Sequence, residues 1–213
     1  MIVAKQKPLE EIRQMIEGYE RILLLGCGTC VAICMAGGEK EVAVLASSLR
    51  MADKISGKNR IFREHTVERQ CEWEFLDKIE EQVKEVDAIL SLACGVGVQA
   101  TSERFPEITV LPGLDTLFMG MPLEEGIWVE RCAGCGNCLL DKTGGICPVT
   151  RCAKGLLNGA CGGSKNGKCE LNPEKDCAWI LIYEQLKKQG KLELIKEFRP
   201  PRDYQLKGWR VTT

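Results

Sequence analysis

The segment RILLLGCGTCVAIC, residues 21–34, decides the fold of this chain. Its first part, Arg21–Gly26, is a short apolar run that ends in glycine, which is typical of a buried strand. Apolar residues at helical spacing predict a helix over Glu72–Val86. Similar runs predict four further strands: Glu41–Ser47, Phe62–Gln70, Asp87–Ala93 and Ile108–Leu111. Phe62–Gln70 is more polar than the others, and we predict that it is an edge strand. Strands that alternate with helices predict an α/β fold with a mostly parallel, Rossmann-like sheet.

The composition of the chain changes after Gly126. Residues 131–177 are rich in Gly and Cys and lack the periodicity of a helix or strand, so this segment needs bound metal to define its structure. We therefore predict two domains. Residues 1–126 form the α/β domain, which begins with an amphipathic helix, and residues 127–213 form an irregular, metal-stabilised module with a helix at Ala178–Lys188 and a tail.

The chain has 213 residues, 13 cysteines and a single histidine, His65. It lacks a signal peptide and a long apolar run, so we expect a cytoplasmic protein without a membrane span. Disulfides rarely persist in the cytoplasm, and dense cysteine usage there indicates metal or redox chemistry based on thiolates. The formal net charge of -1 gives no indication of nucleic-acid binding.

The clearest motif is Cys132-Ala-Gly-Cys135-Gly-Asn-Cys138, followed by Cys147-Pro148. Three thiolates at this spacing can hold one face of a [4Fe–4S] cluster, and a cysteine followed by proline is the ending found in ferredoxins. Ferredoxins have three residues before that last cysteine, whereas eight precede Cys147 here. Structural zinc is the alternative, but zinc usually takes a second C-x2-C pair, which is missing.

Four more cysteines follow in the glycine-rich stretch, at Cys152, Cys161, Cys169 and Cys177. Their spacing matches no common cluster motif. Both a second cluster and a four-cysteine zinc site remain open, and Cys147 is a candidate ligand for this neighbouring site as well.

The N-terminal group consists of Cys27, Cys30, Cys34, Cys71 and Cys94. Cys27 and Cys94 end two predicted strands, and Cys71 follows a third. The carboxyl ends of parallel strands share one edge of the sheet, where ligands gather at a switch point. We therefore predict a cluster held by four of these five cysteines. The alternative is that Cys34, Cys71 and Cys94 are small buried apolar residues.

Gly95-Val-Gly97-Val-Gln-Ala100 fits the dinucleotide pattern G-x-G-x-x-A after a strand. It belongs to a late strand, and a tight strand-to-helix turn explains it equally well. A nicotinamide- or flavin-binding oxidoreductase is thus an alternative function. No residues are arranged for acid–base or nucleophilic catalysis, so we predict no catalytic residue.

Two stretches carry a resemblance to a known family: GCGTCVAICMAGGEKEV at residues 26–42 and CPVTRCAKGLLNGACGGSKNGKCELNPEKDCAW at residues 147–179. They resemble the MetV family, the iron–sulfur subunit of acetogen-type methylenetetrahydrofolate reductase, also called the methylenetetrahydrofolate reductase C-terminal domain family. The resemblance implies a TIM-barrel partner that binds flavin and folate, and it implies zinc alongside iron. The grouping of cysteines into sites does not follow from it.

The expected function is an electron-transfer subunit in one-carbon metabolism. It would take electrons from a donor such as ferredoxin and pass them, through one to three [4Fe–4S] clusters, to the flavin of the catalytic subunit. The competing hypothesis is a zinc-stabilised scaffold or regulatory subunit of the same reductase that carries no electrons.

Overall fold

The computed structural model describes residues 1–203, and the predicted tail beyond them lies outside the described residues. The chain divides into two compact units. The first consists of residues 1–118 and 122–128, and the second of residues 119–121 and those from 129 onward.

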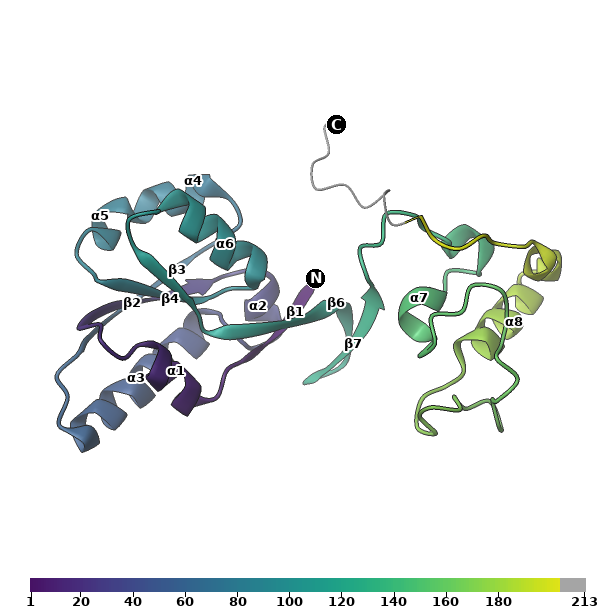
Figure 1. Cartoon of the computed structure of the whole chain (residues 1–213), viewed down its shortest axis with the longest axis horizontal. Coiled ribbons are helices and arrows are strands. Elements are labelled where there is room, and N and C mark those ends of the chain that lie inside the picture. The colour runs from purple at the N-terminus through teal and green to yellow at the C-terminus, as the bar shows by residue number, and fades with distance from the viewer. Residues whose placement is uncertain (204–213) are drawn as a thin grey trace. The chain divides into compact units, whose positions relative to one another are not determined.

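A four-stranded parallel sheet forms the centre of the first unit (Figure 1). In the order β3-β2-β4-β5, its strands are β3 (Ile61–Val67), β2 (Arg21–Cys27), β4 (Ala88–Leu92) and β5 (Thr109–Pro112). These four predicted strands are confirmed, and β3 lies at an edge as expected. The chain runs from β2 outward to β3 and then crosses back to β4 on the other side of β2. A topological switch point therefore lies between the carboxyl ends of β2 and β4.

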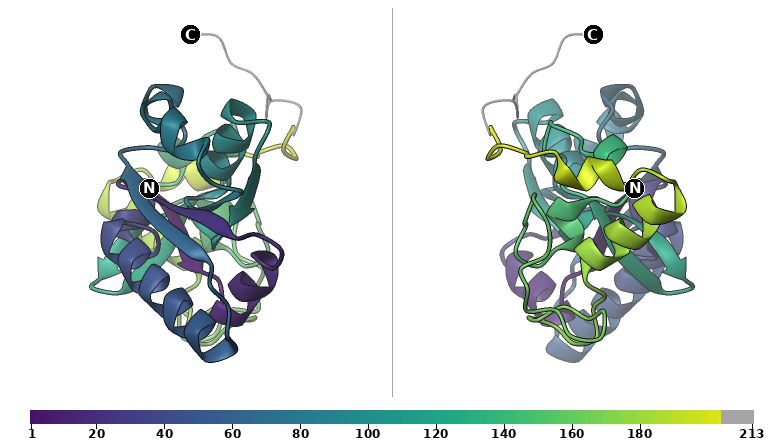
Figure 2. Two further views of the ribbon diagram at one scale, coloured as in Figure 1. Left: turned by 90° about the vertical axis from the view of Figure 1, so that its left-hand side faces the viewer. Right: turned by 90° about the vertical axis from the view of Figure 1, so that its right-hand side faces the viewer.

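The side chains of β2 alternate between two apolar cores. Ile22 and Leu24 pack in one core with α1 (Leu9–Met15) and α3 (Glu39–Ser56). Leu23 and Leu25 pack in the other core, with the helical segment that follows β3. Figures 1 and 2 show helices on both sides of this sheet, with α6 (Gly95–Arg104) on the side opposite α3. A strand buried on both faces explains why 21–26 is a continuous apolar run.

The strand predicted at Glu41–Ser47 is wrong, because this segment lies within helix α3. The backbone N–H of Gly38 donates to the Glu41 carboxylate (2.9 Å) at the start of the helix, and Gly57 ends it in the left-handed conformation (φ 69°). Its buried residues recur at helical spacing, which the short window around EVAVLAS concealed: Val42, Leu45, Ala46, Leu49 and Asp53.

The helix predicted at Glu72–Val86 is present only in short pieces. They are α4 (Trp73–Leu76), η1 (Asp77–Ile79), a 3-10 turn, and α5 (Glu80–Val83). The backbone leaves helical geometry at Ile79 (φ −109°, ψ 7°). Leu76, Ile79 and Val83 still point to one core, so the apolar spacing identified the buried face but not the breaks.

A separate antiparallel sheet has the order β1-β6-β7 and was not predicted. Its strands are β1 (Ile2–Gln6), β6 (Leu114–Glu124) and β7 (Ile127–Cys132). The helix expected from the first residue is wrong over β1, since α1 begins only after Pro8. Gly120 and Pro122 inside β6 mask its pattern, because both residues usually interrupt strands. Gly126, with φ 78°, makes the tight turn to β7.

The second unit contains little regular structure. Its helical elements are η2 (Leu140–Lys142), α7 (Pro148–Arg151), the predicted helix α8 (Ala178–Lys188) and η3 (Leu192–Lys196). Trp179, Ile182 and Leu186 on α8 form its small apolar core. The side chain of Arg199 lies against this core, with its guanidinium over the Trp179 ring and donating to the carbonyl oxygen of Leu157 (3.2 Å). The loops between these elements hold all the cysteines of this unit apart from Cys132.

Candidate functional site

Three of the five predicted N-terminal ligands meet at the carboxyl edge of the parallel sheet. Cys27 is the last residue of β2, and Cys94 is the N-cap residue of α6, just after β4. Cys71 lies in the segment after β3. Although Cys71 is an exposed residue, partial burial of its thiol raises its pKa, and the neighbouring Cys27 and Cys94 thiolates raise it further. We call Cys27, Cys71 and Cys94 the rim cysteines.

The path of the chain at this edge depends on close backbone approaches. The N–H of Cys27 donates to the carbonyl oxygen of Gly37 (2.9 Å), and a Cβ at Gly37 would lie 2.0 Å from the carbonyl oxygen of Leu92. Only glycine fits there. The loop after Cys34 is therefore held against the end of β4, and it fixes Cys27 beside the switch point.

Cys34 lies apart from the rim. It is buried in the apolar core, and its thiol donates weak hydrogen bonds to the carbonyl oxygens of Val31 (3.6 Å) and Ala4 (3.7 Å). Burial raises the pKa of the Cys34 thiol, and the nearby Cys30 raises it further. Metal ligation requires a thiolate, and burial of Cys34 in this core disfavours one. Cys30, at the first position of α2 (Cys30–Ile33), is only half-buried.

Glycines set the backbone path of the loop 132–138. Gly134 and Gly136 adopt left-handed conformations (φ 57° and 81°), and the N–H of Gly134 points at Cys132 Sγ from 3.4 Å. Arg202 donates to the carbonyl oxygens of Cys135 (3.2 Å) and Asn137 (3.3 Å). The loop therefore lies beside a guanidinium group.

Cys147 and Cys152 flank the single helical turn α7, the first as its N-cap and the second as its C-cap residue. Thr150 Oγ1 donates to the carbonyl oxygen of Arg131 (3.2 Å), the residue before Cys132. This bond ties α7 to the start of the loop 132–138. Cys152 lines a small cavity that Cys147 does not line.

This cavity has a volume of about 20 Å³ and is lined by all four remaining cysteines: Cys152, Cys161, Cys169 and Cys177. We call it the four-cysteine cavity. Its volume suits one water-sized atom. Ser164 also lines it, and the buried Oγ of Ser164 has no hydrogen-bond partner among the residues described. Four thiols and an unsatisfied hydroxyl group around so small a space form a donor set that fits a single metal ion.

Charged groups surround the four-cysteine cavity. Arg151 and Lys154 line it, and Lys154 forms an ion pair with Glu170, whose carboxylate lies 3.4 Å from Cys161 Sγ. Hydrogen bonding to Lys154 lowers the pKa of Glu170. A Cβ at Gly163 would lie 2.3 Å from the Glu170 carboxylate, so a larger residue there would displace this side chain. The two cations can offset the negative charge of four thiolates.

The thiols are grouped but not yet arranged as ligands. Within residues 1–203, no three His, Cys, Asp or Glu side chains already surround a common metal position. Thiol rotation is needed before any of these groups holds a metal. His65, on β3, pairs in register with Leu25 on β2 and belongs to none of the cysteine groups.

Three polar residues of these sites were not singled out from the sequence: Gln70, Ser164 and Arg202. Gln70 precedes Cys71 and is fully buried. A glutamine next to a cysteine has no local signature, since its role depends on partners 21 to 45 residues away. Arg202 is equally remote from the loop that it contacts.

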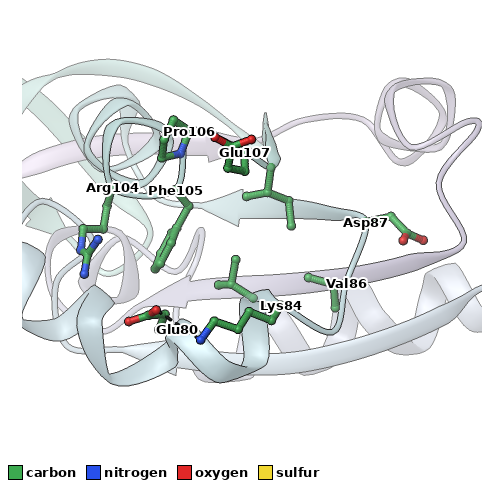
Figure 3. A pocket seen from close by; sticks show the side chains of 10 residues that line it. Glu80, Lys84, Val86, Asp87, Arg104, Phe105, Pro106 and Glu107 are labelled. Atoms are coloured by element: carbon green, nitrogen blue, oxygen red, sulfur yellow. Dashed lines mark ion pairs between the residues drawn. The ribbon is translucent and has the colours of Figure 1, made fainter.

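A larger pocket, about 550 Å³, lies at the opposite edge of the sheet, where β4 and β5 begin (Figure 3). Phe105 and Val86 line it, and its charged groups form ion pairs, as in Arg104 with Asp77 (2.5 Å). Cysteines are absent from its lining, so it is separate from the predicted sites.

The glycines of Gly95–Ala100 have local structural roles. The N–H of Gly95 at the start of α6 donates to Thr116 Oγ1 (2.8 Å). A Cβ at Gly97 would lie 2.7 Å from Ala93 Cβ and 3.0 Å from Gln70 Cβ. Close packing of α6 on the rim therefore accounts for Gly97 without a nucleotide.

Comparison with known proteins gives one family. Residues 111–205 match the family model described as methylene-tetrahydrofolate reductase C terminal. The match includes all eight cysteines of the second unit. No curated protein and no solved structure matches the chain. Among the helices of residues 1–203, none has both the length and the apolar character needed to cross a membrane.

Proposed function

Because residues 111–205 match the family model described as methylene-tetrahydrofolate reductase C terminal, we propose that this chain is the electron-transfer subunit of such a reductase. It would accept electrons from a donor such as ferredoxin and deliver them to the flavin of a separate catalytic subunit. The chain itself would bind metal, whereas flavin and folate would bind to the partner.

The observation that carries this proposal is the meeting of the rim cysteines at the switch point. Three thiols from three strand ends share the edge where α/β proteins bind their cofactors. Cys30 is the preferred fourth ligand, since the Cys34 thiol is directed into the apolar core. The half-buried or exposed side chains of Cys30, Cys71 and Cys94 leave this edge open to an electron donor or acceptor.

A second cluster is proposed for Cys132, Cys135, Cys138 and Cys147. The N–H of Gly134 directed at Cys132 Sγ, and the nearby Arg202 guanidinium, are groups that stabilise negatively charged iron–sulfur sites. The bond from Thr150 to Arg131 joins α7, which Cys147 caps, to the residue before Cys132, and this supports Cys147 as the fourth ligand. An iron–sulfur cluster, when bound, supplies transfer of single electrons.

The four-cysteine cavity is better suited to one zinc ion than to a cluster. Its volume of about 20 Å³ matches a single atom, and zinc with four cysteine ligands is a structural site with no open position. In this assignment Arg151 and Lys154 compensate charge, and the metal stabilises a unit whose apolar core is small.

The same cavity favours the competing function, a zinc-stabilised scaffold that carries no electrons. The two functions differ in what happens when cluster ligands are removed. A scaffold needs only the zinc site and a folded surface, whereas an electron carrier needs the clusters at the rim and in the loop 132–138.

Anaerobic reconstitution tests the proposal. The purified chain should be brown, contain both iron and zinc, and give an EPR signal on reduction. Mixed with its flavoprotein partner, it should let reduced ferredoxin or viologen reduce the flavin. Cys94→Ser should slow this reduction, whereas the matched control Cys34→Ser should not. If cluster-free protein that is still folded and bound supports the same rate of flavin reduction, the scaffold function replaces electron transfer.

A further inference from the structure

One buried side chain contacts all three segments that carry the rim cysteines. Gln70 has no exposed surface and immediately precedes Cys71 in the chain. A buried amide needs hydrogen-bond partners for both its N–H₂ group and its oxygen, because an unpaired polar group in the core is costly.

The amide nitrogen of Gln70 is directed to β2. Its Nε2 donates to the carbonyl oxygen of Leu25 (2.7 Å), two residues before Cys27. This bond links the segment of Cys71 directly to the strand that presents Cys27.

The amide oxygen of Gln70 is directed to β4 and α6. Its Oε1 accepts from Ser91 Oγ (2.6 Å), three residues before Cys94, and from Thr101 Oγ1 (3.2 Å) in the helix that Cys94 caps. Ser91 and Thr101 are also fully buried. The Thr101 hydroxyl has a single proton, which it shares between Gln70 Oε1 and the carbonyl oxygen of Gly97 (2.8 Å), one turn earlier in α6.

Gly97 makes this arrangement sterically possible. A side chain there would lie 3.0 Å from Gln70 Cβ, so α6 could no longer pack over the amide. Gly97, the second glycine of the G-x-G-x-x-A pattern, thus leaves room for the Gln70 side chain, which packs against the start of α6.

We propose that Gln70 is a positioning residue that holds Cys71 beside Cys27 and Cys94, so that the three thiols are preassembled before any metal binds. This inference rests on the proposed function for the role of the three thiols as metal ligands. The hydrogen bonds of Gln70 do not depend on that function. An apolar side chain could fill the same space, whereas only a donor and an acceptor on one planar group can fix the register of β2, β4 and α6 together.

The test compares two variants of the full chain. Gln70→Leu removes the amide. Asp53→Asn weakens a buried ion pair in the same unit, in which Asp53 bonds to Arg60 and Arg60 also bonds to Ile16 at the end of α1. The readout on reduced, metal-free protein is dibromobimane cross-linking of nearby thiols, with cross-linked pairs identified by peptide mass spectrometry. The readout on reconstituted protein is the rate of iron loss to a chelator.

We expect Gln70→Leu to lower cross-linking of Cys71 to Cys27 and Cys94 severalfold and to speed iron loss, while Asp53→Asn leaves both near wild type. Thr101→Val removes one hydrogen-bond donor to Gln70 and keeps the shape of the side chain, so its effect on cross-linking and iron loss should be intermediate. It replaces Gln70→Leu in the test if Gln70→Leu does not fold. Wild-type cross-linking in Gln70→Leu, or in Thr101→Val when only that variant folds, would overturn the inference. An equal loss in Asp53→Asn would also overturn it. Should the wild type cross-link in this way yet bind no iron, the proposed function fails and the positioning role stands.

Discussion

At the scale of single residues, burial separates Cys34 from the candidate ligands Cys71 and Cys94. Cys34 donates to Ala4 and Val31 within an apolar core, whereas Cys71 and Cys94 lie at an open edge of the sheet. Metal ligation requires a thiolate, and removal of the Cys34 proton in that core is disfavoured.

The first prediction follows from this difference. Cys34→Ala should leave iron per chain unchanged, while Cys71→Ala should lower it by about one cluster, because only the second variant removes a proposed ligand. Iron analysis after anaerobic reconstitution measures both. Equal iron loss in the two variants would place Cys34 among the ligands.

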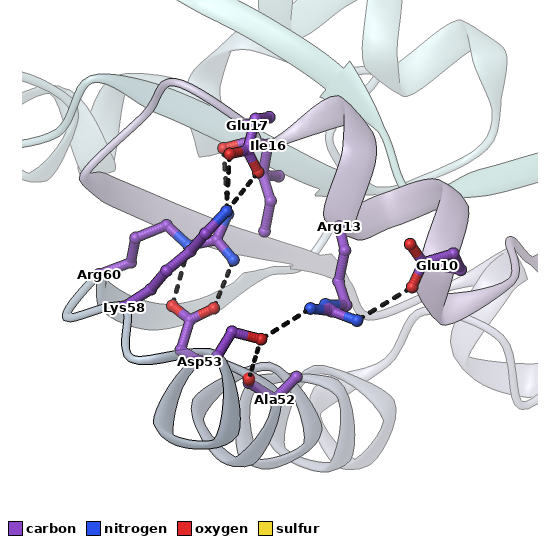
Figure 4. A network of polar contacts seen from close by, with 9 residues as sticks. Glu10, Arg13, Ile16, Glu17, Ala52, Asp53, Lys58 and Arg60 are labelled. Carbon is purple, nitrogen blue, oxygen red and sulfur yellow. Dashed lines mark hydrogen bonds and ion pairs between the residues drawn. The ribbon is translucent and has the colours of Figure 1, made fainter.

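A buried ion pair stabilises the first unit. Arg60 pairs with Asp53 through two hydrogen bonds, and their side chains are only 7% and 5% exposed. Arg60 also donates to the carbonyl oxygen of Ile16 at the end of α1 (3.2 Å), and Figure 4 shows this group between α1 and α3. The nearby pair Lys58 with Glu17 is much more exposed.

The second prediction concerns pH. Asp53→Asn should lower the free energy of unfolding by about 3 kcal/mol at neutral pH, since it leaves Arg60 buried without a counter-charge. The hydrogen bonds from Arg60 hold the pKa of Asp53 below its ordinary value of 3.8. The stabilisation is therefore complete above the unfolded-state pKa of about 4 and declines as the pH falls through the lower folded-state value.

Urea unfolding of metal-free protein at several pH values measures this effect. The difference between wild type and Asp53→Asn should shrink as the pH falls below about 4. Glu17→Gln, at the exposed pair, serves as the control and should change stability little. If the difference in unfolding free energy between wild type and Asp53→Asn stayed constant down to acid pH, the charge of Asp53 would not be the source of the stabilisation.

At the scale of elements, α3 shows why a short apolar segment is ambiguous. In a strand, Val42, Val44 and Ala46 would share one face, because side chains alternate. In α3, Val42 and Leu45 are buried, whereas Val44 is 67% exposed. The packing of α3 on β2 and β3, together with the Gly38–Glu41 bond at its start, decides in favour of the helix.

The third prediction separates these two conformations. Leu45→Ala should cost about 3 kcal/mol of unfolding free energy, as is typical of a buried leucine, while Val44→Ala should cost little. Chemical denaturation of both variants provides the measurement. A large loss in Val44→Ala with a small one in Leu45→Ala would indicate a strand.

At the scale of the whole molecule, the two units rely on different stabilising interactions. The first buries two apolar cores around a parallel sheet. The second has three fully or nearly buried core residues, on α8, and many loops that turn at glycines with positive φ. A core of that size contributes too little to offset the entropy of ordering such loops, so bound metal is expected to supply the rest.

The fourth prediction is that metal removal unfolds only the second unit. After anaerobic chelation of iron and zinc, hydrogen exchange should become fast in α8 and stay slow in β2 and β4. Mass spectrometry of peptides from both units measures this in one experiment. Continued protection of α8 without metal would show that its apolar core is sufficient.

The sequence by itself determined those features that arise from neighbouring residues. The apolar run at residues 21–26 identified β2, the helical spacing at 178–188 identified α8, and the eight cysteines after Gly126 marked a separate module. The motif at Cys132–Cys138 and the family resemblance were likewise readable, because short spacings carry their own geometry. The breaks in the helical segment after β3 and the strands β6 and β7 could not be predicted from the sequence. Glycine and proline obscure the local pattern of β6, and pairing between distant segments is not visible in a local pattern.

The predicted strand ends indicated that Cys27, Cys71 and Cys94 share one edge, but only the tertiary structure decided that Cys34 lies apart from them. Cys71 and Cys94 join Cys27 because the strand order β3-β2-β4 brings three strand ends to one edge, while Cys34 faces the core on the same short stretch of chain. The role of Gln70 depends on partners in two strands and a helix, and no spacing along the chain records it. Proximity in space depends on topology and packing, which are properties of the whole fold rather than of any segment.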